Sequence, residues 1–186
     1  MPEIEEVIIA VPFGMESQAR AQVRAAALEI PVKLTPGGVE RQDSVRIALE
    51  LTSTETEMVI VHDAARPFAT PGMFAAALAA AERVGAAIAA TPLADTLKRV
   101  GDDRMIVATV ARANLWQAQT PQAFRRDLLI SAHERAALDR IVATDDADLV
   151  ERLGASVAVV DGSPLNFKIT TAEDLRLANL LAASNP

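Results

Sequence analysis

The chain has 186 residues, a length typical of one domain with a single sizeable hydrophobic core. Hydrophobic residues make up 51% of it but aromatic residues only 3%, so the core must be built mainly from Ala, Val, Leu and Ile. The net charge of −7 argues against a general nucleic-acid surface, and the lack of cysteine excludes disulfides, thiolate metal sites and a cysteine nucleophile. His62 and His133 are too far apart in sequence to form a zinc pattern. With short apolar runs and no signal-peptide pattern, we expect a soluble cytoplasmic protein.

The predicted elements alternate between strands and helices, which indicates a single α/β domain over residues 1–186 with a largely parallel sheet. Met58–Val61 is a short apolar run and predicts a strand buried on both faces of that sheet. Ser17 is a possible N-cap, and Thr170–Glu173 has the pattern of a capping box before the last helix. Strands are expected at 7–11, 31–34, 58–61, 86–91 and 156–160, and helices at 17–30, 43–51, 71–84, 124–138, 147–153 and 171–183.

Residues 93–116 have a different pattern. Polar and apolar residues alternate on both sides of Gly101-Asp-Asp103. This alternation around a turn predicts a β-hairpin that projects from the sheet.

Asp63 directly follows the strand expected at 58–61. Open α/β sheets bind ligands beyond the carboxyl ends of their strands. Two small residues and then Arg66 follow Asp63, so the segment suits a metal–phosphate group. An Asp63 that only caps the next turn and pairs with Arg66 is an equally good interpretation of this segment alone.

Four further polar clusters lie in expected loops or turns. In the first, Gly37 and Gly38 let a ligand approach the backbone, and Arg41 and Ser44 are placed to hold a phosphate or a base. Taken alone, a plain turn with a capped helix is the better interpretation of that cluster. Lys168 is expected to end a short strand before the last helix, facing an anion, although a surface lysine is commoner. Lys168 belongs to one cluster with 144–146 and 166–167, and the remaining two, 95–99 and 112–122, are each also compatible with a solvated or packing role.

The order of these motifs is more specific than any one of them. In chain order they are Gly-Gly-x-Glu-Arg-x-x-Ser-Val, His-Asp-Ala-Ala-Arg-Pro, Asp-Thr-x-Lys, Arg-x-x-Leu-Trp-x-x-x-Thr-Pro-Gln, Thr-Asp and Asn-x-Lys-x-Thr. This series resembles the 2-C-methyl-D-erythritol 4-phosphate cytidylyltransferase family over essentially the whole chain. The resemblance implies a Rossmann-like three-layer nucleotidyltransferase sheet. It also implies Mg²⁺-dependent transfer of CMP from CTP to methylerythritol phosphate, with release of pyrophosphate, in the non-mevalonate isoprenoid pathway.

The resemblance also implies roles for individual residues. Asp63 would hold Mg²⁺ against the triphosphate, and Lys168 would steady the α-phosphate. In the family the hairpin reaches into a neighbouring subunit, so residues 93–116 would be the dimerisation arm of a homodimer. The cytidine would be contacted by Gly38, Arg41, Ser44 and Ala64, and the methylerythritol phosphate by Arg66, Thr96, Arg112, Thr144 and Asp145.

Two motifs with which the family begins are absent from these 186 residues. The family begins with a strand, a glycine-rich Ala-Ala-Gly-x-Gly-x-Arg loop and a Pro-Lys-Gln motif, whereas 7–11 resembles its second strand. We therefore expect an exposed apolar sheet edge or face and fewer contacts to the triphosphate.

Two alternatives to the methylerythritol enzyme stay open. One is a cytidylyltransferase for another polyol phosphate, such as ribitol 5-phosphate, and Ala65 in His-Asp-Ala-Ala-Arg-Pro argues against it. The other is a nucleotide-binding or dimerisation remnant that does not catalyse, which the missing glycine-rich loop favours.

Overall fold

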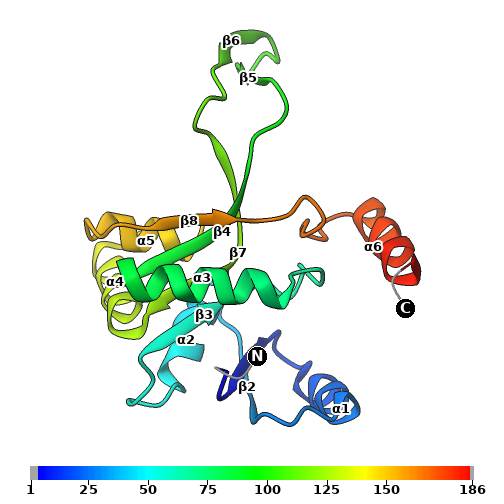
Figure 1. Ribbon diagram of the computed structural model, residues 1–186, viewed down its shortest axis with the longest axis vertical. Coiled ribbons are helices and arrows are strands. Elements are labelled where there is room, and N and C mark those ends of the chain that lie inside the picture. Colours follow the sequence, from blue (N-terminus) through cyan, green and yellow to red (C-terminus); the bar gives the residue numbers. More distant parts are fainter. Residues whose placement is uncertain (1–3, 185–186) are drawn as a thin grey trace.

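The computed structural model describes residues 4–184, and Figure 1 shows the arrangement of their elements. None of the helices in this part of the chain is long and apolar enough to cross a membrane. In chain order the elements are β1 (Val7–Val11), α1 (Glu16–Ala26), β2 (Val32–Pro36), α2 (Arg41–Glu50), β3 (Met58–Val61), α3 (Pro71–Val84), β4 (Ala86–Pro92), β5 (Leu97–Val100), β6 (Ile106–Val110), β7 (Trp116–Arg125), α4 (Arg126–Asp139), α5 (Asp146–Arg152), β8 (Ala158–Asp161) and α6 (Ala172–Ser184).

Four strands form the central sheet, in the order β3-β7-β4-β8. β7 runs antiparallel to both of its neighbours, and β8 is parallel to β4. Three of the four strands therefore run in the same direction. The prediction of a mostly parallel α/β sheet is confirmed.

The sequence did not predict β7, the second strand of this sheet. The segment Trp116–Arg125 contains a Thr-Pro pair, which suggested a turn, and a helix was expected from Phe124. In the structure Gln119, Thr120 and Gln122 of β7 are buried. The Gln119–Pro121 stretch lies where β4 shifts register between Ile88 and Ala90. A proline without an N–H is tolerated in a sheet at such an irregularity.

The prediction that Met58–Val61 is a strand buried on both faces of a parallel sheet was wrong in part, because its neighbour in the sheet is the antiparallel strand β7. β3 pairs antiparallel with β7 and has no second strand neighbour among the described residues. Only Val59 of β3 is fully buried, the other three being partly buried.

Helices cover the sheet on both faces. Neighbouring residues of a strand point to opposite faces, and the core divides accordingly. Ala86 and Phe124 pack with Leu129 of α4 and with α5, whereas Ala87 and Ala123 pack with alanines of α3. The small alanine side chains let α3 lie close to the sheet. The result is a three-layer arrangement, with α3 on one face and α4 and α5 on the other (Figure 1).

β1 and β2 form a separate parallel pair that is not hydrogen-bonded to the central sheet. The carbonyl oxygen of Val11 accepts a hydrogen bond from Gly37 N–H at 2.7 Å, which ties β1 to the loop before α2. Near this pair, Phe13 and Val39 are 93% and 95% exposed.

Two predicted helix caps were wrong by one or two residues. α1 begins at Glu16, so Ser17 lies inside the helix and is not its N-cap. At α6 the capping pair is Thr171 and Asp174, because Asp174 N–H donates to Thr171 Oγ1 and Thr171 N–H donates to Asp174 Oδ2. Hydrogen bonds from the backbone and hydroxyl of Thr170 and from Thr171 lower the pKa of Asp174 to about 2.

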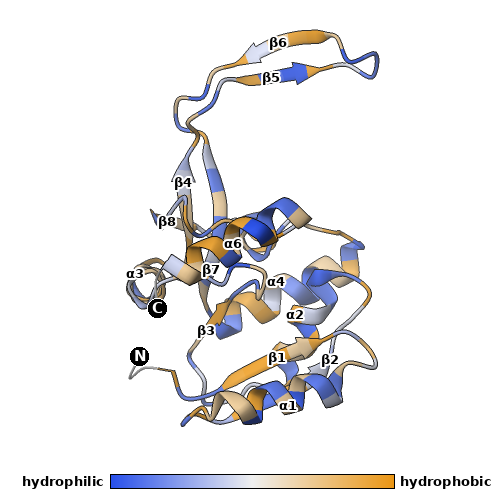
Figure 2. Ribbon diagram, turned by 90° about the vertical axis from the view of Figure 1, so that its right-hand side faces the viewer, coloured by the Kyte–Doolittle hydropathy of each residue, from blue (hydrophilic) through white to orange (hydrophobic). Residues whose placement is uncertain are grey.

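The segment 93–116 contains β5 and β6, which pair antiparallel and project away from the central sheet (Figures 1 and 2). Every residue of β6 is at least partly exposed. Met105, Ile106 and Val107 are each more than 60% exposed, so the tip of the hairpin presents apolar side chains to its surroundings.

The buried position of Phe124 gives a first prediction. Its side chain is 0% exposed within the larger core cluster. Phe124→Ala should lower the free energy of unfolding by about 3–5 kcal/mol, because it removes buried apolar surface and leaves a cavity. Urea denaturation measures this, with the exposed Phe13→Ala as the matched control. Equal losses in the two variants would contradict the assignment of Phe124 to the core.

Candidate active site

Asp63 lies just beyond the carboxyl end of β3 and is surrounded by three cationic side chains. Arg41 Nε is 2.8 Å from Asp63 Oδ1, and Lys168 Nζ is 2.9 Å from Asp63 Oδ2. Arg66 Nε lies further away, 4.0 Å from Oδ2. Three segments remote in sequence therefore meet at one carboxylate, as the topology of an open α/β sheet leads one to expect.

The backbone at Asp63 is fixed by Thr120 of β7. Thr120 Oγ1 accepts a hydrogen bond from Asp63 N–H at 3.0 Å and lies 2.9 Å from His62 Nδ1. His62 Nε2 is 3.1 Å from the carbonyl oxygen of Arg66. One tautomer satisfies all these contacts, with Nε2–H donating to Arg66 O and the Thr120 hydroxyl donating to Nδ1. Burial lowers the pKa of His62, which favours this neutral form.

The charges of the cluster stabilise one another. Burial alone would raise the pKa of Asp63, but hydrogen bonds from Arg41 and Lys168 outweigh it and hold the pKa below its ordinary value. Burial would likewise lower the pKa of Arg41, but the carboxylates of Asp146 and Asp63 outweigh it and raise the pKa. For Arg66 burial prevails, and its pKa is lowered. Asp63 is therefore ionised and the cluster carries an excess of positive charge, a suitable environment for phosphate.

Lys168 lies in a loop before α6 and does not end a strand, which corrects the sequence prediction. The loop is held by Asn166, which is fully buried. Asn166 Nδ2 donates to the carbonyl oxygen of Thr120 at 2.8 Å, and Asn166 O accepts from Arg66 Nη1 at 2.9 Å. Lys168 reaches Asp63 because this loop is anchored on β7.

The segment before α2 is tightly closed on itself. Gly38 N–H donates to Ser44 Oγ at 3.0 Å, and a Cβ at Gly38 would overlap the side chain of Asp43. Glu40 and Asp43 form a reciprocal capping box at the start of α2. The turn and capped helix are therefore present, and they carry Arg41 toward Asp63. Ala64 is exposed in the turn that follows Asp63.

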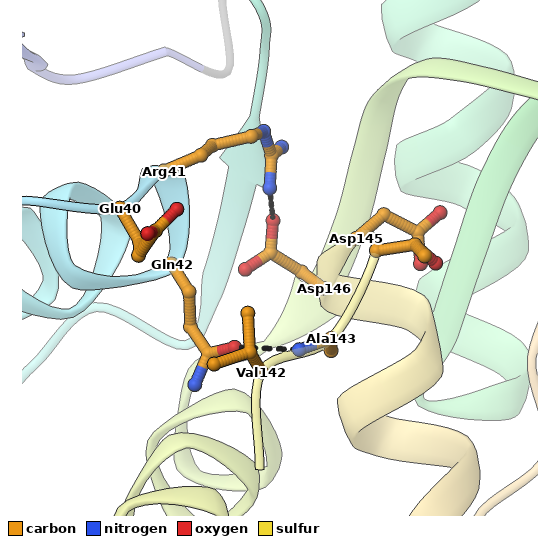
Figure 3. A pocket seen from close by; sticks show the side chains of 8 residues that line it. Glu40, Arg41, Gln42, Val142, Ala143, Asp145 and Asp146 are labelled. Atoms are coloured by element: carbon orange, nitrogen blue, oxygen red, sulfur yellow. Dashed lines mark hydrogen bonds and ion pairs between the residues drawn. The ribbon is translucent and has the colours of Figure 1, made fainter.

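Thr144 and Asp145 lie beside this cluster, on the rim of a pocket of about 200 Å³ between α2 and the loop before α5 (Figure 3). Asp145 is the N-cap of α5, since its Oδ1 accepts from Asp148 N–H at 2.9 Å. Its Oδ2 accepts from Gln122 Nε2 of β7 at 2.8 Å. The pocket is lined by Glu40, Arg41, Gln42, Val142, Ala143, Thr144, Asp145 and Asp146.

The structure does not bring Thr96 and Arg112 to this cluster. Both are exposed in the hairpin segment. Within residues 4–184 neither side chain hydrogen-bonds or forms an ion pair with a member of the cluster.

Sequence reasoning gave no role to Thr120, Gln122 or Asp146, each of which contacts a candidate site residue directly. The available signals are the polar run Gln119-Thr-Pro-Gln122, whose Thr-Pro pair favours a turn, and the Asp pair at 145–146.

The side chains around Asp63 show how the expected magnesium ion could be held. The described residues contain no group of three His, Asp or Glu side chains arranged to hold a metal. Asp63 offers hard carboxylate oxygens, but its neighbours Arg41, Arg66 and Lys168 are cations. Such a donor set fits Mg²⁺ only when phosphate oxygens of a ligand complete the coordination, which is how Mg²⁺ is commonly held.

The three-layer sheet, with this cluster beyond β3, has the fold of an α/β nucleotidyltransferase, and two similar solved structures agree. One is 2-C-methyl-D-erythritol 4-phosphate cytidylyltransferase from Thermus thermophilus, with a TM-score of 0.83 at 38% identity over 98% of this chain and 84% of that one. Another is 4-diphosphocytidyl-2C-methyl-D-erythritol synthase from Anaerococcus prevotii, with a TM-score of 0.89 at 30% identity over 98% and 83%.

The sequence comparisons give the family. The family model for 2-C-methyl-D-erythritol 4-phosphate cytidylyltransferase matches residues 1–183. The enzyme of that name from Syntrophus aciditrophicus is 45% identical over 183 residues, which are 95% of this chain and 76% of the relative. The one from Pelotomaculum thermopropionicum is 44% identical over 94% of this chain and 74% of the relative. The chain belongs to the 2-C-methyl-D-erythritol 4-phosphate cytidylyltransferase family.

The role of Thr120 gives a second prediction. Thr120→Val keeps the shape of the side chain but leaves the Asp63 N–H without its acceptor. The free energy of unfolding should fall by about 1 kcal/mol or more, because a partly buried donor loses its hydrogen bond. Urea denaturation against Thr54→Val, which changes an exposed threonine in a loop, provides the comparison. A Thr120→Val protein as stable as Thr54→Val would show that this hydrogen bond does not hold the turn.

Proposed function

We propose that this chain transfers CMP from CTP to 2-C-methyl-D-erythritol 4-phosphate and releases pyrophosphate. The observation that carries the proposal is the Asp63 carboxylate with Arg41 and Lys168 in direct contact and Arg66 beside it. This arrangement, in a chain of the cytidylyltransferase family, suits a reaction that brings two phosphate groups together.

The proposed reaction needs no covalent intermediate with the protein. A phosphate oxygen of the polyol phosphate attacks the α-phosphorus of CTP, a new phosphoanhydride bond forms, and the bond to the leaving pyrophosphate breaks. Negative charge accumulates around the α-phosphorus, and Lys168 is the cation proposed to stabilise it. Arg66 is proposed to bind the phosphate of the polyol, whose charge would otherwise repel the nucleotide.

Asp63 is the proposed ligand of Mg²⁺, together with phosphate oxygens of the nucleotide. When bound, Mg²⁺ would neutralise charge on the triphosphate. Asp63 keeps its carboxylate ionised through its contacts with Arg41 and Lys168.

The two substrates are assigned to two neighbouring regions. Gly38, Arg41, Ser44 and Ala64 are proposed to contact the cytidine, as the resemblance implies. Thr144 and Asp145, which line the pocket beside Arg41, are proposed to bind the polyol phosphate together with Arg66. Thr96 and Arg112 are exposed in the hairpin. Since the site residues lie on the body of the chain, we propose that the 93–116 arm delivers these two residues to a neighbouring subunit in a homodimer.

The third prediction tests the reaction itself. The purified chain should release pyrophosphate when CTP, methylerythritol phosphate and Mg²⁺ are all present, and release should stop when Mg²⁺ is chelated. Asp63→Asn should lower the rate by roughly 100-fold or more, because it removes the carboxylate proposed to hold Mg²⁺ against the triphosphate. Asp139→Asn removes an exposed carboxylate that pairs with Arg135 on α4, away from the cluster, and is expected to keep most of the activity.

Each outcome of this assay decides between the functions. Faster release with ribitol 5-phosphate would change the polyol assigned to the site. No release with either polyol, together with binding of CTP in equilibrium dialysis, would replace the proposed enzyme with a nucleotide-binding protein. Full activity of Asp63→Asn would overturn its assignment as the metal ligand.

The fourth prediction tests the shared site. In the proposed dimer each site combines Asp63 of one subunit with Arg112 of the other. Asp63→Asn and Arg112→Ala should each be inactive alone. After subunit exchange, an equal mixture should regain about a quarter of wild-type activity, because half the dimers are mixed and each mixed dimer has one intact site. A mixture that stays inactive, although exchange is demonstrated, would place both residues in the same subunit's site.

A further inference from the structure

Asp146 is a buried carboxylate on the side of Arg41 remote from Asp63. Its side chain is 1% exposed, and its Oδ2 lies 2.7 Å from Arg41 Nη1 (Figure 3). Its Oδ1 accepts a hydrogen bond from His133 Nε2 of α4 at 3.0 Å. His133 is 2% exposed, so this pair lies in the protein interior.

Arg41 thus bridges two carboxylates. Its Nη1 donates to Asp146 and its Nε to Asp63, and the two aspartates come from different parts of the fold. The contacts form a continuous series from α4 through α5 and α2 to the carboxyl end of β3. A guanidinium has five N–H donors in a fixed plane, so holding one edge with Asp146 orients the plane toward Asp63.

We infer that Asp146 is a positioning residue that acts through Arg41 to hold Asp63 in place for the transfer reaction. This inference rests on the proposed function, in which Asp63 is the metal ligand. Asp146 fixes the Nη1 edge of Arg41, and Arg41 Nε in turn fixes Oδ1 of Asp63. Oδ2 is then left facing Lys168. His133 holds the second oxygen of Asp146, which prevents the carboxylate from turning away from Arg41.

A purely structural role for Asp146 would have a different consequence. A buried ion pair can contribute to stability without any effect on the site beyond the loss of folded protein. In that case catalysis per folded molecule would be unchanged when Asp146 is replaced. A positioning role predicts a lower turnover number in protein that is still folded.

The first test measures kinetics and fold together. Asp146→Asn keeps the size of the side chain but removes its charge. It should lower kcat by roughly 10- to 100-fold, the scale of a misplaced catalytic group, and change the KM for CTP much less. Asp148→Asn is the matched control, because Asp148 lies two residues on in α5 and pairs only with Arg152 on the surface. Circular dichroism shows whether each variant is folded.

A double-mutant cycle separates action through Arg41 from an independent effect. Arg41→Lys keeps the charge but loses the fork that contacts both aspartates. If Asp146 acts through Arg41, adding Asp146→Asn to Arg41→Lys should lower kcat little further. If the loss in kcat of the double variant equals the product of the losses in the two single variants, the two residues act independently and the inference is wrong.

His133 provides a second route should Asp146→Asn fail to fold. His133→Leu removes the donor to Asp146 and should lower kcat in the same direction. His133→Gln keeps an N–H donor and should restore the rate. Equal kcat for wild type, His133→Leu and folded Asp146→Asn would overturn the inference.

A readout without turnover distinguishes this inference from the proposed function. In protein labelled with ¹⁵N-arginine, the Nε–H signal missing from Arg41→Lys belongs to Arg41. Its hydrogen exchange should be slow in wild type and Asp148→Asn and faster in Asp146→Asn. If the wild type transfers no CMP, the proposed function fails, whereas the exchange rate still decides whether Asp146 positions Arg41. Unchanged exchange in Asp146→Asn would overturn it.

Discussion

The ionised carboxylate of Asp63 holds three cationic side chains together at the carboxyl end of β3. Arg41 comes from α2, Arg66 from the turn after β3 and Lys168 from the loop before α6. Three cations at such distances repel one another, and only a shared anion lets them remain together. The net charge of −7 is therefore no guide to the local potential. An acidic protein can present a cationic site when the fold gathers a few arginine and lysine side chains around one carboxylate.

Polar side chains of β7 hold the loops of the candidate site in position. Thr120 binds the backbone of Asp63, Gln122 binds Asp145, and Gln119 Nε2 donates to Ser163 O in the loop that leads to Lys168. All three are nearly fully buried. A buried polar group is costly unless it is hydrogen-bonded, so each of them restricts a loop to the conformations that provide a partner. The strand that supports the core through Phe124 also aligns three parts of the site.

The sequence was sufficient for the parts of the molecule that depend on local pattern. Helix Pro71–Val84 and the strand at Val7–Val11 have the predicted bounds, and the carboxyl-end rule placed Asp63 in the site. β7 was missed because its buried residues are polar and include Pro121, features that indicate a turn whenever their partners are unknown. Asp146 was missed for the same reason, since its contacts with Arg41 and His133 exist only after distant segments have packed. Ligand-binding roles came from the order of the motifs, because composition and periodicity contain no information on the substrate.

The two cations in contact with Asp63 differ in how firmly the fold holds them. In the structure both oxygens of Asp63 are engaged, one by Arg41 and one by Lys168. Arg41 is held from behind by a buried carboxylate, whereas Lys168 has a flexible and 41% exposed side chain. If Arg41 moved away from Asp63, the buried carboxylate of Asp146 would also lose its contact with Arg41. Lys168 can move away from Asp63 without breaking any contact of Asp146. On the proposed function, Lys168 would turn to a phosphate while Arg41 keeps the carboxylate oriented. Arg41 and Lys168 thus have separate tasks. They differ because Arg41 is also bound by the buried carboxylate of Asp146, whereas the side chain of Lys168 is exposed.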